Sequence, residues 1–224
     1  EPNVAPHPDL PLLPLIWEDD RYLSRWGTVL AKGVKRVTTM GTDCHRNTLN
    51  YKIADNERVD SYRRMMLWFS NHLLVTPKAD GSIDDRSLKD ALRAGRLYGA
   101  FEVLGYPEGF DYAAVADGKI AEMGDTVSLA KGVELRVRMP KVAYLDPKVA
   151  APVLRARVLK AVDGGWQEVA VGGGNLAFAV TEAGAYRAEV RMVPRHLLGW
   201  LGSLVEVAET EMVWIYANAI YVAQ

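Results

Sequence analysis

The hydrophobic positions of the chain follow two different periods, and the change between them falls near residue 110. In the first part, apolar residues recur every three to four positions, which predicts helices over 19–32, 60–74 and 84–95. Two short segments, 35–40 after the first helix and 97–104 after the third, have the composition of strands. A helix followed closely by a strand is typical of an α/β unit, so we expect residues 1–110 to form an α/β domain.

The second part alternates apolar and polar residues. The alternation is strict over 134–139 and 185–193, and Asp163-Gly-Gly165 predicts a hairpin turn between two further strands. Strands at roughly ten-residue spacing with turn residues between them predict a β-sandwich for residues 111–224. Tyr186, near the start of a strand, fits an immunoglobulin-type tyrosine corner, in which the hydroxyl bonds nearby backbone. A plain inward-facing core aromatic at Tyr186 fits the sandwich equally well.

Composition and charge limit the classes of function. The chain has 27 Lys and Arg against 28 Asp and Glu, so its near-neutral charge gives no reason to expect nucleic-acid binding. No apolar run approaches the roughly 20 residues that cross a bilayer, so no transmembrane helix is expected. A single cysteine excludes an intrachain disulfide and a multi-cysteine zinc site. These counts leave the compartment, cytoplasmic or periplasmic, open.

The candidate chemistry lies in the segment Gly41-Thr-Asp-Cys-His-Arg46, directly after the predicted strand 35–40. The spacing Asp43-x-His45 allows a carboxylate and an imidazole to approach one cation from a turn, and this donor pair suits Zn, Mn or Fe. Cys44 would then point away from the site, which argues against a nucleophilic thiol. The alternative is that Asp43 caps Arg46 or a backbone amide while His45 is an ordinary surface residue.

This segment resembles the last metal-binding motif of the PHP (polymerase and histidinol phosphatase) metallohydrolases, in which a strand ends in Gly-Ser-Asp-x-His or a close variant. The stretches 88–101, 110–125 and 214–222 resemble the closing helix and strand and the appended sandwich of bacterial PHP proteins. The resemblance implies the C-terminal portion of a distorted (β/α)7 barrel, followed by an immunoglobulin-like β-sandwich. It also implies a divalent metal (Zn, Mn or Fe) that activates water against a phosphoester, with Asp43 and His45 as ligands.

Two further residues are candidates: Arg46 because it follows His45 directly, and His7 because PHP proteins have a histidine upstream of the last motif. Arg46 would contact the anionic group of a small ester or phosphoester, although it could instead pair with a nearby carboxylate. His7 would add a metal ligand, although the Pro-rich lead around it could simply leave its ring in solvent.

The chain also departs from the PHP pattern, because it has no His-x-His motif and only 42 residues precede Asp43. The remaining ligands would therefore come from a complementary N-terminal PHP chain or fragment. A separate chain, a truncated sequence and a non-catalytic relic are all consistent with this. We therefore expect part of a metal-dependent phosphoesterase. The alternative is a non-catalytic binding or structural subunit that uses the sandwich, with exposed aromatics such as Trp166 or Trp200, and the half-barrel surface.

Overall fold

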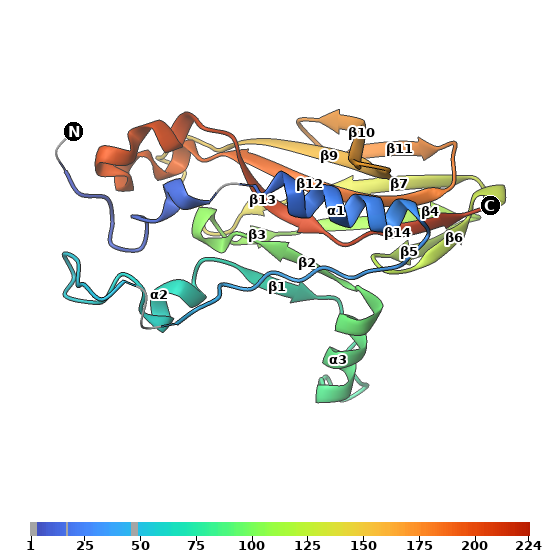
Figure 1. The fold of residues 1–224 in the computed structure, drawn as a ribbon, viewed down its shortest axis with the longest axis horizontal. Coiled ribbons are helices and arrows are strands. Elements are labelled where there is room, and N and C mark those ends of the chain that lie inside the picture. The colour runs from blue at the N-terminus through green and yellow to red at the C-terminus, as the bar shows by residue number, and fades with distance from the viewer. Residues whose placement is uncertain (1–3, 17, 46–48) are drawn as a thin grey trace.

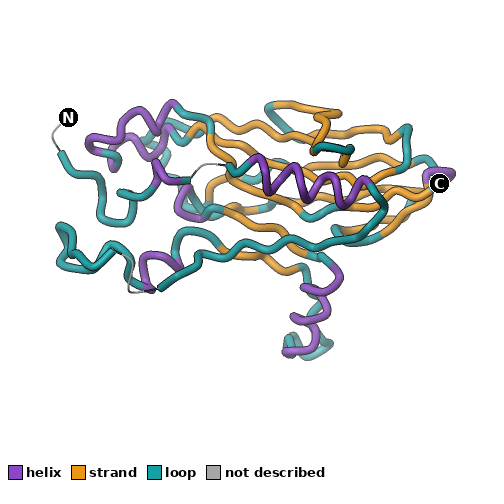
Figure 2. The backbone as a smooth tube through the Cα atoms, in the orientation of Figure 1, coloured by secondary structure: helices purple, strands orange, loops and turns teal. Residues whose placement is uncertain are grey.

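The computed structural model describes residues 4–16, 18–45 and 49–224, and most of its regular structure is β (Figures 1 and 2). Within these ranges lie three α-helices: α1 (Asp20–Ala31), α2 (Tyr62–Met66) and α3 (Asp85–Ala94). Short 3-10 helices span Leu13–Leu15, Glu102–Leu104, Leu129–Lys131, Arg195–Trp200 and Gly202–Glu209. None of the helices in the described part of the chain is long and apolar enough to span a membrane.

A large and a small sheet contain nearly all the strands. The large sheet comprises β1 (Ser70–Leu73), β2 (Leu97–Ala100), β6 (Thr126–Ser128), β9 (Val153–Val162), β10 (Gly165–Gly172), β12 (Gly184–Val193), β13 (Met212–Ala217) and β14 (Ile220–Ala223). The small sheet has the order β11 (Leu176–Val180), β7 (Val133–Arg138), β4 (Asp111–Ala116), β5 (Lys119–Glu122). A separate two-stranded ribbon joins β3 (Pro107–Glu108) to β8 (Lys141–Val142).

Strand β12 organises the large sheet. It pairs with β9 on one side, and on the other side with β14 along its first half and β13 along its second half. Strand β10 extends the sheet beyond β9 through the predicted hairpin, in which Val162 pairs with Gly165. Strands β2 and β1 extend it beyond β13, so the large sheet takes strands from both sides of residue 110.

The two sheets share one hydrophobic core, which gives the arrangement of a β-sandwich. Leu135 and Tyr112 from the small sheet are fully buried, as are Val190 and Trp214 from the large sheet. The Tyr112 hydroxyl crosses between the sheets and donates to the carbonyl of Tyr186 at 2.9 Å. The Tyr186 hydroxyl donates to the carbonyl of Glu182 at 2.7 Å, so the predicted backbone bond of a tyrosine corner is confirmed.

Helix α1 covers the outer face of the large sheet over β9, β10 and β12 (Figure 1). Asp19 caps its first turn by accepting the N–H of Arg21, as the predicted helix start requires. Trp26 and Leu30 are its buried apolar residues. Gly27 allows the close approach, because a Cβ at that position would lie 2.1 Å from the carbonyl oxygen of Gly165.

The predicted barrel is wrong. Strands β1 and β2 are antiparallel and belong to the large sheet, and in the described ranges the one parallel pair is β6 with β14. The segment 35–40 is extended but lies outside both sheets. The predicted helix 60–74 is confined to Tyr62–Met66, and the chain then turns into β1. Parallel strands alternating with covering helices are what a barrel needs, and the chain pairs these segments antiparallel instead.

Candidate functional site

The loop that follows the extended segment places the side chains of Asp43 and His45 against each other. The Nε2 atom of His45 lies 2.9 Å from Oδ1 of Asp43. Both side chains face solvent, with 90% of the Asp43 side chain and 55% of the His45 side chain exposed. Asp43 has a φ of +49°, a left-handed conformation that Asp tolerates better than most residues. The backbone turn at Asp43 therefore accompanies a close pair of potential metal donors.

Two asparagine side chains hold the backbone that leads into this loop. The Asn218 amide accepts the N–H of Thr38 and donates to its carbonyl, each at 2.9 Å. Asn71 makes the same pair of bonds to Met40, at 2.9 and 2.8 Å. Met40 also lies directly over Gly99, where a Cβ would come within 1.9 Å of its sulfur. The two asparagine side chains thus supply the backbone hydrogen bonds that a neighbouring strand would otherwise make, and they fix the chain as far as Met40.

Asp60 holds the backbone that follows the loop. Its Oδ2 accepts the N–H of Leu49 at 2.9 Å, and its carboxylate binds Arg58, with both contacts at 2.8 Å. Burial and the negative charge of Asp60 raise the pKa of the Cys44 thiol. A raised pKa keeps Cys44 protonated at neutral pH, which argues against its use as a nucleophile.

The Asp43–His45 pair meets part of what a divalent metal requires. The contact brings a carboxylate oxygen and an imidazole nitrogen within 2.9 Å of each other, and this donor combination suits a divalent metal. A catalytic zinc takes at least three protein ligands. Among the described residues, no three His, Cys, Asp or Glu side chains are grouped closely enough to hold a metal. The pair, called the half-site below, offers two donors and would need at least one more to hold such a metal.

The other two predicted site residues are not placed at this half-site. His7 belongs to the N-terminal segment, where its ring packs edge-on against Trp200 at 5.5 Å and its Nδ1 accepts the N–H of Asp9 at 3.3 Å. Arg46, the predicted anion contact, lies outside the described residues.

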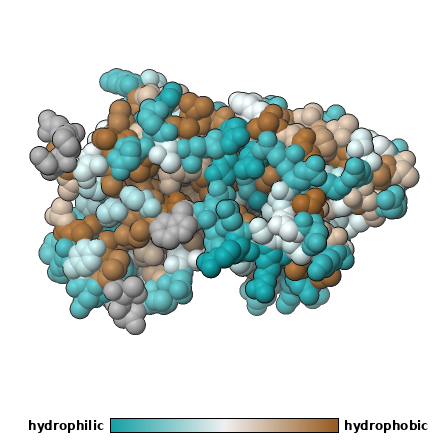
Figure 3. Space-filling view, turned by 45° about the horizontal axis from the view of Figure 1, so that its top comes forward, coloured by the Kyte–Doolittle hydropathy of each residue, from teal (hydrophilic) through white to brown (hydrophobic). Residues whose placement is uncertain are grey.

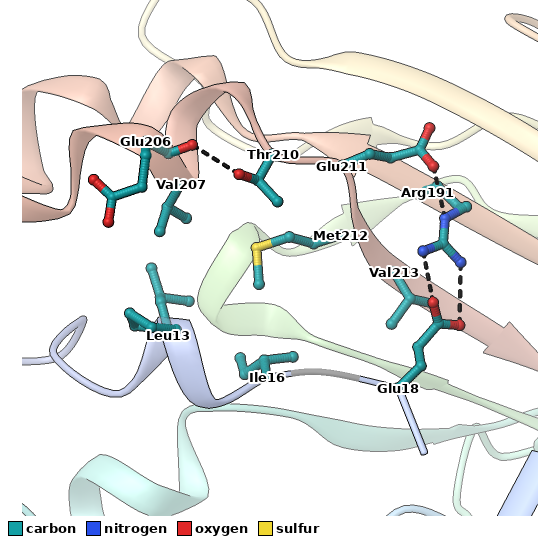
Figure 4. A pocket seen from close by; sticks show the side chains of 11 residues that line it. Leu13, Ile16, Glu18, Arg191, Glu206, Val207, Thr210, Glu211, Met212 and Val213 are labelled. Carbon is teal, nitrogen blue, oxygen red and sulfur yellow. Dashed lines mark hydrogen bonds and ion pairs between the residues drawn. The ribbon is translucent and has the colours of Figure 1, made fainter. Parts of the chain in front are cut away.

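A second feature is a pocket of about 390 Å³ between the N-terminal segment and the 3-10 helix Gly202–Glu209 (Figure 4). Leu13, Ile16 and Met212 give it an apolar lining. Arg191 and Glu18 close one end through bonds of 2.6 and 3.1 Å. Burial acts to raise the pKa of Glu18, but hydrogen bonds from Arg191 and Tyr216 outweigh it and hold the pKa below its usual range. The Glu18 carboxylate is therefore ionised, and its bonds to Arg191 close this end of the pocket.

Alternation along β12 predicts outward, solvated positions for Arg187 and Glu189, but α1 covers them and each is about 98% buried. They form an ion pair at 2.5 Å, and the Arg187 guanidinium lies over Trp26, Trp166 and Tyr216 at 4.5 to 5.3 Å. The Nε and Nη1 atoms of Arg187 have no hydrogen-bond partner among the described residues, so the aromatic faces are its remaining favourable contacts. In the sequence, the apolar face of α1 indicates that this helix covers part of a sheet, but it does not show which strand residues become buried.

Comparison with known proteins adds no assignment. Neither the protein-family models nor the curated protein sequences contain a match to this chain.

Proposed function

We propose that the chain supplies part of the metal centre of a metal-dependent phosphoesterase. The observation that supports this most directly is the 2.9 Å approach of the Asp43 carboxylate and the His45 imidazole on an anchored, solvent-facing loop. Zn, Mn and Fe all accept this combination of oxygen and nitrogen donors.

The roles of the residues follow from their positions. Asp43 offers a carboxylate oxygen and His45 offers Nε2, while Asn71 and Asn218 hold the backbone that precedes them. A divalent cation bound there would lower the pKa of a coordinated water and polarise the leaving oxygen of a phosphoester. Arg46, which follows His45 in the sequence, is proposed to contact the anionic group of that substrate.

The remaining ligands are proposed to come from a complementary chain or fragment. Two protein donors are fewer than a catalytic metal takes, and the described residues place no third donor beside them. The solvent exposure of Asp43 and His45 leaves space for such donors to approach.

The first experiment measures metal binding. Isothermal titration of the purified chain with Zn²⁺ should show weak binding, and both Asp43→Asn and His45→Ala should abolish it. Glu102→Gln is the matched control, because Glu102 also lies 2.9 Å from a histidine, His72, at a different place. Equal binding by His45→Ala and the unaltered chain would rule out the proposed ligands.

A second candidate function is a non-catalytic interaction subunit, and a specific observation favours it. Large apolar side chains are exposed together around a shallow cavity near the N-terminal segment: Val4, Leu198, Trp200 and Val205, at 44 to 57% exposure. Hydrophobic side chains also gather at this end of the molecule in Figure 3. Trp166 does not serve such a surface, because it is half-buried and its indole donates to the Leu23 carbonyl.

The two candidates make different predictions for Trp200→Ser. If the chain is a binding subunit, this substitution should weaken capture of a partner and leave Zn²⁺ titration unchanged. If the chain contributes to a hydrolase through Asp43 and His45, assembly with its complementary chain and the resulting phosphoesterase activity should survive Trp200→Ser and fail in His45→Ala.

A further inference from the structure

A cleft of about 330 Å³ lies on the outer face of the large sheet, between α1 and the extended segment that precedes the Asp43–His45 loop. Tyr22 and Trp26 line it from α1. Tyr216 and Phe101 contribute further aromatic rings, and Thr39 lies on the opposite wall. Clefts of this size with predominantly apolar and aromatic linings are typical sites for small molecules.

The charged groups of the cleft are already neutralised. Glu18 accepts hydrogen bonds from Arg191 at 2.6 and 3.1 Å and from the Tyr216 hydroxyl at 2.8 Å. The carboxylate of Asp19 is committed to the first turn of α1 and to the Arg21 side chain. A charged ligand would therefore lose its hydration without gaining an ionic partner, so the cleft favours an uncharged guest.

One wall keeps its hydrogen-bonding capacity. The hydroxyl groups of Thr38 and Thr39 make no hydrogen bond within the described part of the chain, and both residues line the cleft. The Trp26 indole, in contrast, donates to the Arg36 carbonyl at 3.1 Å. An aromatic guest with one oxygen substituent would match both the rings and the free threonine hydroxyls.

The same wall leads directly to the half-site. Met40 lines the cleft, and Asp43 follows three residues later, so their Cα atoms are at most about 11 Å apart. Asn71 fixes the Met40 end of this stretch through two backbone bonds. The cleft and the Asp43–His45 loop are therefore neighbours along the chain.

We infer that this cleft binds an uncharged aromatic alcohol. The inference depends only on the cleft and is independent of the metal-binding function proposed above.

The test uses 1-naphthol as a probe at neutral pH with the metal-free chain, followed by tryptophan fluorescence and by titration calorimetry. We expect saturable binding in the millimolar to submillimolar range, which is ordinary for an uncharged ligand of this size. Tyr22→Ala should weaken binding about threefold to tenfold through the loss of one aromatic contact. Thr39→Trp, which fills the cleft from the opposite wall, should abolish it.

The matched control is Tyr62→Ala, because Tyr62 is similarly exposed but lies on α2 (54% against 61% for Tyr22). Binding by the Tyr62→Ala variant should equal that of the unaltered chain. Absence of saturable binding, or equal losses in Tyr22→Ala and Tyr62→Ala, would overturn the inference.

Failure of the proposed function would look different. Naphthol binding that persists in His45→Ala, in a chain that takes up no Zn²⁺, would support the cleft and refute the metal half-site. Zn²⁺ binding without naphthol binding would support the half-site and refute the cleft.

Discussion

Replacing Asn218 by alanine tests whether a side chain holds the extended segment on the sheet. Asn218 is buried, with 2% exposure, and its amide makes three contacts. It accepts from the N–H of Thr38 at 2.9 Å and donates to the carbonyls of Thr38 at 2.9 Å and Leu97 at 3.2 Å. Asn218→Ala removes all three and leaves the Thr38 amide without a partner in the described structure.

The expected loss is about 2–3 kcal/mol of unfolding free energy, because each hydrogen bond contributes a net of about 1 kcal/mol and solvent can reach half-buried Thr38. Asn71→Ala removes two comparable bonds to Met40 and should cost about 2 kcal/mol. Urea unfolding measures these losses. Amide hydrogen exchange then locates them, because Thr38 should lose protection in Asn218→Ala and Met40 in Asn71→Ala.

A matched control is Asn175→Ala. Asn175 also accepts a backbone N–H through its side chain, from Met139 at 2.9 Å, but at an exposed position beside the small sheet. It should cost about 1 kcal/mol or less and leave the exchange rate of Thr38 unchanged. If the Thr38 amide stays protected in Asn218→Ala, the side-chain clamp does not hold the segment and the argument for an anchored Asp43–His45 loop is lost.

Three further substitutions or conditions test the packing. Glu189→Ala should cost about 3–5 kcal/mol in urea unfolding because it leaves buried Arg187 without its carboxylate, and a variant within 1 kcal/mol of the unaltered chain would contradict this. Gly27→Ala should lower the melting temperature despite the better helix propensity of alanine, since its Cβ would meet the Gly165 carbonyl at 2.1 Å; a rise would refute the close contact. Burial lowers the pKa of His196 below its usual 6.5, so as the pH falls the unfolded chain binds a proton at this residue before the folded chain does. The free energy of unfolding should therefore decrease as the pH drops below 6.5. His196→Gln should remove this contribution to the pH dependence.

Local patterns were sufficient for several elements. The starts of the helices predicted over 19–32 and 84–95, the hairpin turn before Gly165 and the alternation that buries Leu135 all depend on neighbours close in sequence, and the structure confirms them. The approach of Asp43 and His45 also follows from their spacing, since they are two residues apart in a turn.

The remaining features depend on distant partners. Segment 35–40 has the composition of a strand, but its backbone partner at Thr38 is the side chain of Asn218, 180 positions away. No periodicity in one segment reveals such a contact. The run through Trp68 to Leu73 carries apolar residues at spacings that suit either a helix or a strand, and pairing with β2 decides in favour of β1. The sequence around Arg187 does not predict its burial either, because that burial results from the position of α1 on the sheet.

The position of β13 in the large sheet has a consequence for the kinetics of folding. It pairs with β2 on one side and β12 on the other, so residues 97–100 and 212–217 must meet across more than a hundred positions. The hairpin of β9 and β10 closes over a two-residue turn and can form early. Closure of long loops slows the pairing of distant strands. We therefore expect β1 and β2 to join the large sheet late in refolding, after β9, β10 and β12 have assembled, and the loop of Asp43 and His45 to be ordered last.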